Sequence, residues 1–436
     1  MRTHPRFLVV AMMFLAAPAA HAAAPVQPES PRAVEESYAE ALIAPVSAVT
    51  SPPAPAASPT STISVGRIGS AYMNVSFDTL LDLGWSTSRG GLNLGGHDPA
   101  SRGFTMPNSE LVLDGAVDPY FKGVADIVLS LDADGETAVE LEESYLLTTA
   151  LPWNLQIKAG QFFTELGRHN PQHPHQWAFV DQPLVIGRMF GPDGLRSPGM
   201  RLSWLVPTSW YAEVMVAILN GQGETAWSFR SGESVEIHGG EPVERPLRGA
   251  GDLVYVPRAT VSFDLSDTQT VVAGASAALG PNNSGPRAAT RVYGVDAYWK
   301  WRAVSAQAGF PFLSWQTEAL YRSYEADSRA AAEDEDAALP AETLHDWGGY
   351  SQVLWGFTRG WVVGLRGELV AADDGAFASE LRRDRTRVAA NVTWYPTEFS
   401  KTRLQYNHDR GDQSESDHSL WLQVDFLLGA HAAHKF

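Results

Sequence analysis

The chain has 436 residues, which is enough for two ordinary domains or for one large barrel. It contains no cysteine, so disulfide bonds, thiolate metal ligands and a cysteine nucleophile are excluded. The formal net charge of −18 argues against nucleic acid as a partner, because phosphate binding needs a basic surface. Beyond the N-terminal segment, no stretch offers the roughly 18–20 consecutive apolar residues of a transmembrane helix.

Residues 1–22 have the pattern of a secretory signal peptide. Arg2 and Arg6 give a positive start, residues 7–17 form an apolar core, and residues 20–22 (AHA) offer a small-residue cleavage motif. We therefore expect the chain to be exported from the cytoplasm.

Residues 23–65 are rich in Pro, Ala, Ser and Thr. Pro52, Pro53, Pro55 and Pro59 disfavour a regular helix or a central strand there. The composition predicts a flexible periplasmic linker, with too little apolar sequence for a plug domain.

From there on, sixteen segments alternate apolar and polar residues with period two, which predicts β-strands. They are residues 69–84, 104–117, 120–131, 137–149, 154–164, 199–207, 210–220, 253–265, 269–280, 290–302, 311–324, 346–358, 361–371, 384–395, 401–409 and 418–428. Strands of about ten residues, when tilted, are long enough to cross a bilayer. The expected fold is all-β: a transmembrane antiparallel β-barrel of about 16 strands, formed by residues 66–436.

The connections between these segments alternate in length, with one short exception at Asp132–Glu136. Short ones contain Ser266–Asp267 and Arg359–Gly360, whereas long ones include residues 165–198 and 221–252. Outer-membrane barrels have short periplasmic turns and longer external loops. The parity of the connections therefore supports the barrel, and an even number of strands returns the C-terminus to the periplasm.

The side of the strand on which apolar and polar residues lie gives a further test of the predicted barrel. One face of the last segment carries the apolar residues Leu420, Leu422, Val424, Phe426 and Leu428. Gln423 and Asp425 lie on the opposite face. Segment 384–395 places Val388 outside and Arg387 inside in the same way. Apolar residues outside and polar residues inside are typical of a barrel with an aqueous lumen.

Residues 137–165 carry the sharpest family likeness, in an acidic strand and a turn that precede Gly160, Gln161 and Phe162. This segment resembles the Gram-negative outer-membrane porins of the phosphate-selective type. The resemblance implies that the following loop, residues 165–198, is the third external loop and folds inward. The terminal Phe436 resembles the assembly signal that the barrel-assembly machinery reads on the C-terminal strand of outer-membrane proteins.

We expect the loop 165–198 to constrict the pore. Its charged residues, with those of the barrel wall, form the candidate selectivity ring: Arg168, Asp181, Arg188, Asp193, Arg196 and Arg201, with Lys122, Lys158, Arg258 and Arg387. Opposed acidic and basic groups set the selectivity of a pore. The alternative is that these charges pair locally and only hold the loop.

Three histidines lie within seven residues of this loop: His169, His173 and His175. Neutral imidazoles bind Zn²⁺ or Cu²⁺, and Asp181 or His97 is the candidate further ligand. Pro171 and Pro174 disfavour a helix that would align the histidines. The alternative is a polar loop in which they cap turns or stack on Trp177. His431 and His434 form a second candidate pair, and the C-terminal residues 431–434 resemble the ends of barrels described as zinc-regulated receptors.

The sequence predicts an outer-membrane porin for passive diffusion of small hydrophilic solutes or ions. A metal-linked (zinc) receptor or uptake channel is the first alternative, and an outer-membrane enzyme or adhesin is the second. No enzyme is expected, because residues 274–278 (GASAA) lack the second glycine of a nucleophile elbow. Beyond possible zinc, no cofactor is expected. The expected partners are the lipid bilayer, lipopolysaccharide, the assembly machinery and, by the porin resemblance, two further copies in a homotrimer.

Overall fold

A computed structural model of the chain describes most of the predicted barrel. The described residues are 63–68, 71–87, 95–99, 102–116, 118–131, 135–231, 237–239, 242–329, 338–411 and 416–429. The predicted signal peptide, most of the predicted linker, and the C-terminal His431, His434 and Phe436 lie outside them.

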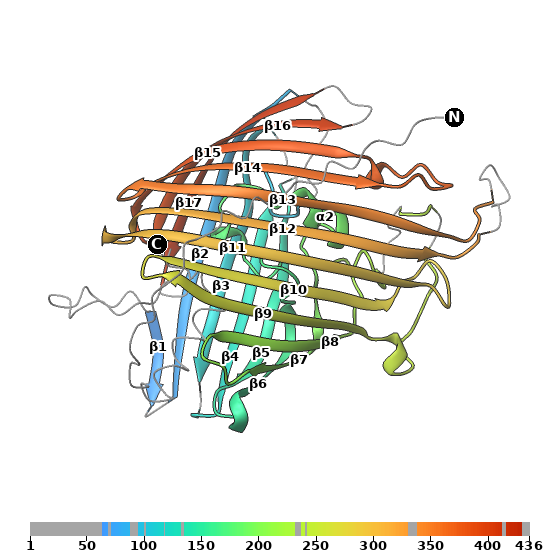
Figure 1. The fold of residues 1–436 in the computed structure, drawn as a ribbon, viewed down its shortest axis with the longest axis horizontal. Helices are drawn as coiled ribbons and strands as arrows, with labels where there is room; N and C mark the ends of the chain where they lie inside the picture. Colours follow the sequence, from blue (N-terminus) through green and yellow to red (C-terminus); the bar gives the residue numbers. More distant parts are fainter. Residues whose placement is uncertain are drawn as a thin grey trace. The chain divides into compact units, whose positions relative to one another are not determined.

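The described residues form one antiparallel sheet in which sixteen strands close into a ring (Figure 1). Its strands are β2 (Ala71–Ser86), β3 (Gly103–Ala116), β4 (Phe121–Leu131), β5 (Thr137–Thr148), β6 (Leu155–Phe163), β7 (Arg196–Leu205), β8 (Tyr211–Leu219), β9 (Val254–Ser266), β10 (Gln269–Pro281), β11 (Ala289–Gln307), β12 (Phe310–Ala326), β13 (Glu342–Thr358), β14 (Trp361–Ala372), β15 (Arg385–Thr397), β16 (Ser400–Gly411) and β17 (Asp417–Leu428). Each strand pairs with the next, and β17 pairs with β2 from Ser419 opposite Ser86 to Leu428 opposite Phe77. The predicted 16-strand antiparallel barrel is confirmed.

A seventeenth strand, β1 (Ile63–Ile68), pairs with the first residues of β2 and was not predicted. It begins inside residues 23–65, which were predicted to be linker. The segment ISVGRI is too short for its period-two pattern to be distinguished from the surrounding polar sequence.

The connections alternate in length as the sequence predicts, except for residues 132–136 between β4 and β5, the short exception that the sequence also shows. The turn between β13 and β14 has two residues, Arg359 and Gly360, and Gly360 adopts a positive φ of 78°. The turn between β5 and β6 contains Trp153 and Asn154, both with φ near +60°, in the one-turn helix Pro152–Asn154. Long connections join the opposite ends of the strands, so the two rims of the barrel differ.

The outer face of the barrel is apolar. In β17, Leu420 and Phe426 expose 46% and 50% of their surface, whereas the intervening Gln423 and Asp425 are buried. In β15, Val388 is exposed and Arg387 is 1% exposed. The inside and outside faces predicted for these strands are confirmed.

Exposed tryptophans lie near the ends of the strands. Trp361 and Trp394 lie beside the short turns and stack with ring centroids 5.9 Å apart. Trp347 is exposed nearer the other end of β13, eight residues before Trp355 on the same face. At about 3.3 Å per residue, eight residues span roughly 26 Å along the strand. This spacing is that of two aromatic belts bordering an apolar band.

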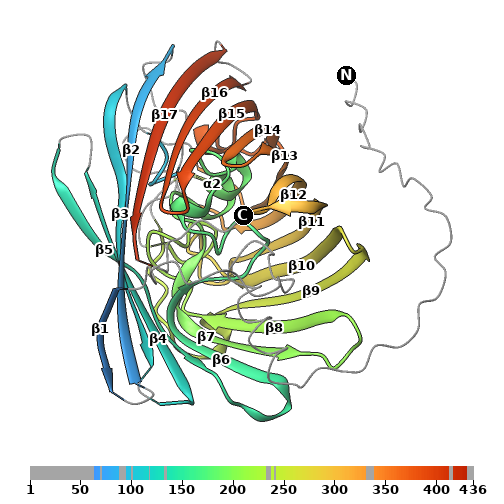
Figure 2. The same ribbon diagram turned by 90° about the vertical axis from the view of Figure 1, so that its left-hand side faces the viewer.

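Residues 164–195, between β6 and β7, form the segment that we call the lumen segment. It contains the one-turn helix Pro174–Gln176 and the helix α2 (Leu184–Phe190), which lies inside the ring of strands (Figure 2). The sequence predicted no regular structure here, so the helices are a correction. No described helix has the length and apolar character needed to cross a bilayer.

All seven residues of α2 are buried, and the helix packs against β12, β13 and β14. Its side chains Leu184, Ile186 and Phe190 belong to an apolar cluster that also includes Phe162, Phe229 and Leu320. The lumen near α2 is therefore filled by an apolar core, whereas the sequence predicted a water-filled, polar interior. The charged groups lie on the wall strands around this core.

The chain can turn into the lumen because of Gly167. This residue has φ of +67°, and a Cβ added to it would lie 1.6 Å from Oε1 of Glu318. The Glu318 carboxylate instead accepts hydrogen bonds from the backbone N–H groups of Arg168 and His169, each at 3.2 Å. A side chain at position 167 would displace this acceptor.

Candidate functional site in the barrel lumen

Buried acidic side chains gather on one arc of the inner wall, and five buried basic side chains lie on the neighbouring arc, together with the carboxylates of Asp346, Glu368 and Asp409. The acidic wall comprises the inward side chains Asp78, Glu110, Asp126, Glu142 and Glu143, from β2 to β5. The basic wall comprises Arg322, Arg366, Arg387, Lys401 and Arg403, from β12, β14, β15 and β16. The lumen segment contacts both walls.

A β-bulge builds the densest part of the acidic wall. Between β4 and β5 the register shifts, so that Asp126 lies opposite Glu143 while Ile127 lies opposite Leu141. Glu142 is the extra residue. A bulge turns two consecutive side chains toward one face, and both Glu142 and Glu143 are buried in the lumen.

Asp181 joins the lumen segment to the basic wall. Its Oδ1 lies 2.5 Å from Nη2 of Arg366, and its Oδ2 lies 2.8 Å from Nη1 of Arg387. Gln405 and Asn407 of β16 donate further hydrogen bonds to the same carboxylate. Burial raises the pKa of Asp181, but the two guanidinium groups outweigh it and hold the pKa below its ordinary value.

The backbone from residue 175 to 181 runs along β16. Lys401 donates to the carbonyl oxygen of His175, and Nη2 of Arg403 donates to that of Trp177 at 2.8 Å. Gln405 accepts from the backbone N–H of Val180 at 2.9 Å. The alternate, inward residues Lys401, Arg403 and Gln405 of β16 therefore bind three backbone positions along the lumen segment.

Arg188 of α2 makes a second junction with the wall. It contacts Asp346 of β13, whose carboxylate also receives Nη2 of Arg322 at 2.8 Å and faces Arg382. Arg188 also donates to the backbone carbonyls of Arg382 and Arg383. Three guanidinium groups thus converge on one buried carboxylate, and burial lowers the pKa of Arg188 to about 10 despite that carboxylate.

The next junction is with the acidic wall, through two of the predicted histidines. Nδ1 of His173 lies 2.8 Å from Oε2 of Glu142, and Nδ1 of His175 lies 3.1 Å from Oε2 of Glu110. The two imidazole rings stack with centroids 5.8 Å apart. Burial lowers the pKa of His173, but Glu142 and Glu110 overcome it and raise the pKa well above its ordinary value.

His169, the third predicted histidine, lies apart from this cluster. Its ring contacts Trp177 and Tyr350, with centroids 5.2 Å and 6.2 Å away. Burial, reinforced by the charge of Arg366, lowers the pKa of His169 to about 3. The structure therefore does not bring the three histidines together around one point.

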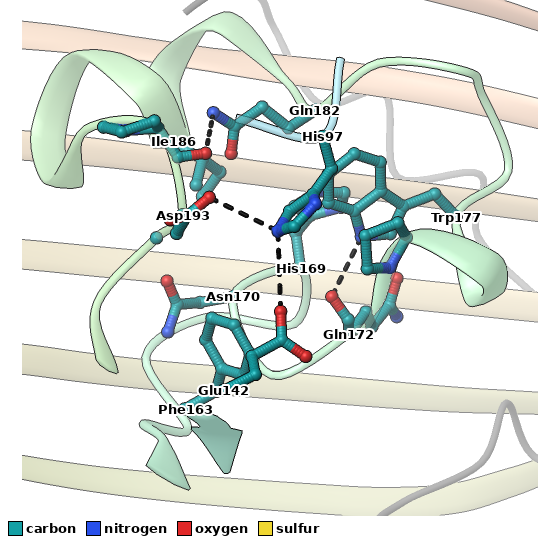
Figure 3. Close-up of a pocket in the computed structure, with 13 residues that line it drawn as sticks. His97, Glu142, Phe163, His169, Asn170, Gln172, Trp177, Gln182, Ile186 and Asp193 are labelled. Carbon is teal, nitrogen blue, oxygen red and sulfur yellow. Dashed lines mark hydrogen bonds and ion pairs between the residues drawn. The ribbon is translucent and has the colours of Figure 1, made fainter. Parts of the chain in front are cut away.

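A small pocket is lined by His169 and His97, among other residues (Figure 3). Nε2 of His97 lies 3.5 Å from Oε1 of Glu142 and 3.4 Å from Oδ1 of Asp193. Burial opposes protonation, but these two carboxylates raise the pKa of His97 to about 10. His97 thus links the first long connection, through Asp193, to the lumen segment.

The remaining predicted pore residues are distributed around the wall. Arg196 and Arg201 belong to β7 and pair with Glu140 and Glu165, respectively. Arg258 pairs with Asp296 at 2.7 Å. These three arginines therefore pair with carboxylates of the wall strands or of the adjoining start of the lumen segment.

The last three predicted pore residues, Arg168, Lys158 and Lys122, lie at different places with respect to the lumen. The Arg168 guanidinium lies over the ring of Tyr298, and Lys158 lies 3.6 Å from Glu143 at the edge of the acidic wall. Lys122 is exposed near the beginning of β4, close to a short turn and away from the lumen segment. The structure thus gathers most of the predicted residues around the lumen segment but not Lys122.

Sequence reasoning missed several residues that hold the site. Asp78 and Glu110 lie directly opposite each other on β2 and β3, but this register depends on the pairing of strands joined by a long connection. Two adjacent acids, Glu142 and Glu143, within an alternating strand were the available signal of a bulge. Arg366 was missed because its partner Asp181 lies 185 residues away.

No model of a known protein family matches the chain. Two solved structures share its fold: the outer-membrane channel DcaP of Acinetobacter baumannii and an anion-selective porin from Comamonas acidovorans. The first has a TM-score of 0.52 at 14% identity and covers 84% of this chain and 99% of that chain. The second has a TM-score of 0.52 at 8% identity and covers 82% and 99%, respectively.

One relative is similar in sequence along most of its length. An uncharacterized protein of Aquifex aeolicus (strain VF5) is 31% identical over 363 residues, which are 78% of this chain and 73% of the relative. The chain therefore belongs to the same family as this Aquifex aeolicus protein, and it has the 16-strand barrel fold seen in porins.

Proposed function

We propose that the protein is an outer-membrane channel through which small hydrophilic solutes or ions diffuse, with the lumen segment as its constriction. The observation that carries this proposal is the path of that segment across the lumen. It contacts β12 through Glu318, β16 through residues 175–181, and the acidic wall through His173. A closed barrel with an apolar exterior and a charged interior is suited to a bilayer.

The proposed location in the outer membrane implies specific partners. The lipid bilayer and lipopolysaccharide would surround the apolar outer face. The barrel-assembly machinery would read the C-terminal strand, with Phe436 as its signal, and the mature protein would form a homotrimer. These partners follow from the proposed porin role and from the resemblance of residues 137–165 to phosphate-selective-type porins.

The charges suggest a constriction with both signs rather than a purely anionic or cationic filter. Asp181 neutralises much of the basic wall, where Arg366 and Arg387 are each 1% exposed. Arg168 and Lys300 are only half-buried, and they lie over the rings of Tyr298 and Phe312, respectively. We propose that these accessible cations, with Gln172, contact passing solutes and favour small anions.

Conductance of the full chain in planar bilayers tests the proposal. Wild-type protein should give small, ohmic single-channel steps, since the lumen segment and its apolar core narrow the barrel. Deleting residues 170–192 and joining the ends with a short Gly-Ser linker should raise the single-channel conductance several-fold. R168Q should shift the reversal potential in a salt gradient toward cation selectivity.

R291Q is the matched control, because Arg291 carries the same charge in a half-exposed pair with Glu325. It should leave both the conductance and the reversal potential unchanged. Folding is checked for each variant by heat-dependent migration in a gel. If the folded wild type and the folded deletion variant both fail to conduct, the channel proposal is wrong.

A further inference from the structure

Five buried side chains converge where the lumen segment meets the acidic wall: Asp78, Glu110, Glu142, His173 and His175. Each is exposed by 7% or less. Their donor atoms fall into two sets that share Glu110, and the three atoms of each set lie within 4.8 Å of one another. One set contains Asp78 and His175, and the other contains Glu142 and His173.

Each carboxylate directs an oxygen without a hydrogen-bond partner into this cluster. Oδ1 of Asp78 accepts the backbone N–H of Glu110, whereas its Oδ2 has no partner among the described residues. Oε1 of Glu110 accepts from Asn108 at 2.6 Å, whereas its Oε2 is likewise unsatisfied. Leaving buried polar atoms unsatisfied is costly, so their convergence calls for a ligand.

The His173 imidazole has the orientation that a metal ligand needs. Nε2 of His173 lies 3.1 Å from Oε2 of Glu143, which fixes the ring and leaves Nδ1 facing Glu142. A metal-binding histidine commonly donates its other nitrogen to a carboxylate in this way. Nδ1 of His173 and Nδ1 of His175 both lack hydrogen-bond partners in the described structure, although each lies near a carboxylate oxygen.

We propose that this cluster binds divalent transition-metal ions, with Zn²⁺ as the preferred ion and Glu110 as the shared ligand. Two imidazoles, once the ion displaces the proton from His173, and three carboxylates supply nitrogen and oxygen donors of the type that Zn²⁺ accepts. Two histidines make Ca²⁺ and Mg²⁺ poor matches, because these ions prefer an all-oxygen shell. Positive charge on the ions balances the three carboxylates, which are otherwise buried together.

Binding would join distant parts of the chain. His173 and His175 come from the lumen segment, whereas the carboxylates come from β2, β3 and β5. The ion therefore fastens the segment to the acidic wall. This property goes beyond diffusion through a channel, and metal binding can be measured whether or not the protein conducts.

The test is titration of the untagged full chain in detergent with ZnCl₂ after treatment with EDTA. Calorimetry and elemental analysis of the dialysed protein should give one or two Zn²⁺ ions per chain. E110Q, which keeps the shape of the shared ligand, should abolish high-affinity binding. E143Q, which removes the negative charge beside Nε2 of His173 without changing any of the five proposed ligands, should weaken the affinity by about 10- to 100-fold.

H169Q is the matched control within the lumen segment, because His169 was a predicted ligand and lies outside the cluster. It should bind Zn²⁺ as the wild type does, and so should H431Q/H434Q. MgCl₂ and CaCl₂ should give no comparable heat. Co²⁺ absorption bands that shift in E143Q provide a second readout from folded protein.

Absence of Zn²⁺ binding to folded wild-type barrel would overturn the proposal and would indicate that protons alone balance the acids. Equal binding by E110Q would overturn it too. If H169Q or H431Q/H434Q loses the Zn²⁺ while E110Q retains it, the ions bind elsewhere on the chain, and this cluster is not the site.

Discussion

The lumen segment is joined to the barrel in two chemically different ways. At the basic wall, the Asp181 carboxylate receives two guanidinium groups and two side-chain amides, so each of its oxygens is satisfied by protein. At the acidic wall, His173 and His175 face carboxylates, but the facing atoms lack hydrogen-bond partners among the described residues. Both junctions are buried, and only the first is complete without an added ion.

The difference suggests that the two junctions have different tasks. A buried carboxylate with several charged donors is costly to disrupt, because any loss leaves guanidinium charges without a partner. A junction that needs a ligand changes its strength with the concentration of that ligand. The Asp181 junction should therefore fix the path of the segment, while the histidine junction responds to metal.

The largest effect is expected from D181A. Loss of this carboxylate removes the partner that Arg366 and Arg387 share, although Glu368 and Asp409 still pair with them. We therefore expect a cost of about 3 kcal/mol, the lower end for breaking a buried ion pair. We expect the docked segment to open more often, and amide hydrogen exchange of residues 175–181 to accelerate accordingly. Hydrogen exchange with mass spectrometry measures the change.

D373N is the control for this variant, since Asp373 pairs with Arg382 and is 37% exposed. Half-exposed ion pairs contribute about 0–1 kcal/mol, so exchange in residues 175–181 should hardly change. Equal acceleration in D181A and D373N would show that the Asp181 junction is not special.

Metal removal should have the next largest effect, at the acidic wall. If the protein is first held at 100 times the dissociation constant for Zn²⁺, chelation removes about 2.7 kcal/mol of stabilisation. Exchange in residues 171–176 should then accelerate by about 100-fold, since 1.36 kcal/mol corresponds to a factor of ten. E110Q should already exchange rapidly and should not respond to EDTA.

A response to EDTA that is equally large in E110Q would remove the proposed contrast between the two junctions. So would a wild type whose exchange is unaffected by both Zn²⁺ and EDTA. H169Q serves again as the positive control and should respond to chelation as the wild type does.

Acid should weaken the segment through His169. Its pKa falls from 6.5 to about 3 on folding, so the opened segment binds a proton that the docked segment does not. The stability contributed by neutral His169 is complete above pH 6.5 and is lost as the pH falls toward 3. Within this window, the opening free energy should fall by about 1.4 kcal/mol per pH unit.

H169Q isolates this contribution, because glutamine does not titrate. Opening free energies of the wild type and H169Q should diverge below pH 6.5, with the smaller slope in the variant. Asp181 titrates at lower pH, since its pKa lies below its ordinary value, and it contributes equally to both proteins. Parallel profiles between pH 6 and pH 4 would show that His169 is solvated when the segment is docked.

The barrel was predictable from sequence because lipid and lumen impose opposite requirements on alternate residues. Strand β17 shows this: its five apolar residues at even positions were assigned outside, and they are exposed. The helix α2 was not predictable in this way. It has seven residues that are buried on all sides and no side-chain N-cap, so it shows neither an amphipathic period nor a start signal.

The site was only partly predictable. The histidines were found by their spacing, but spacing placed His169 with His173 and His175, whereas prolines turn the chain between them. The carboxylates that face His173 come from three strands, and their approach depends on strand register and on the bulge at Glu142. Such contacts link residues 30 or more positions apart, which no local pattern encodes.

The smallest effect is expected from substituting Lys122. This substitution distinguishes the effect of a charge that lies in the lumen from the effect of charge alone. The sequence grouped Lys122 with Lys158 as a pore residue, but it is exposed near a short turn, while Lys158 is 9% exposed beside Glu143. K122Q should change stability by less than about 0.5 kcal/mol, as exposed substitutions usually do. It should also leave the single-channel reversal potential unchanged, whereas K158Q should alter exchange in the lumen segment by removing a cation from the edge of the acidic wall. A selectivity change in K122Q as large as that of R168Q would mean that solutes are selected at the rim with the short turns, and not where the lumen segment crosses the barrel.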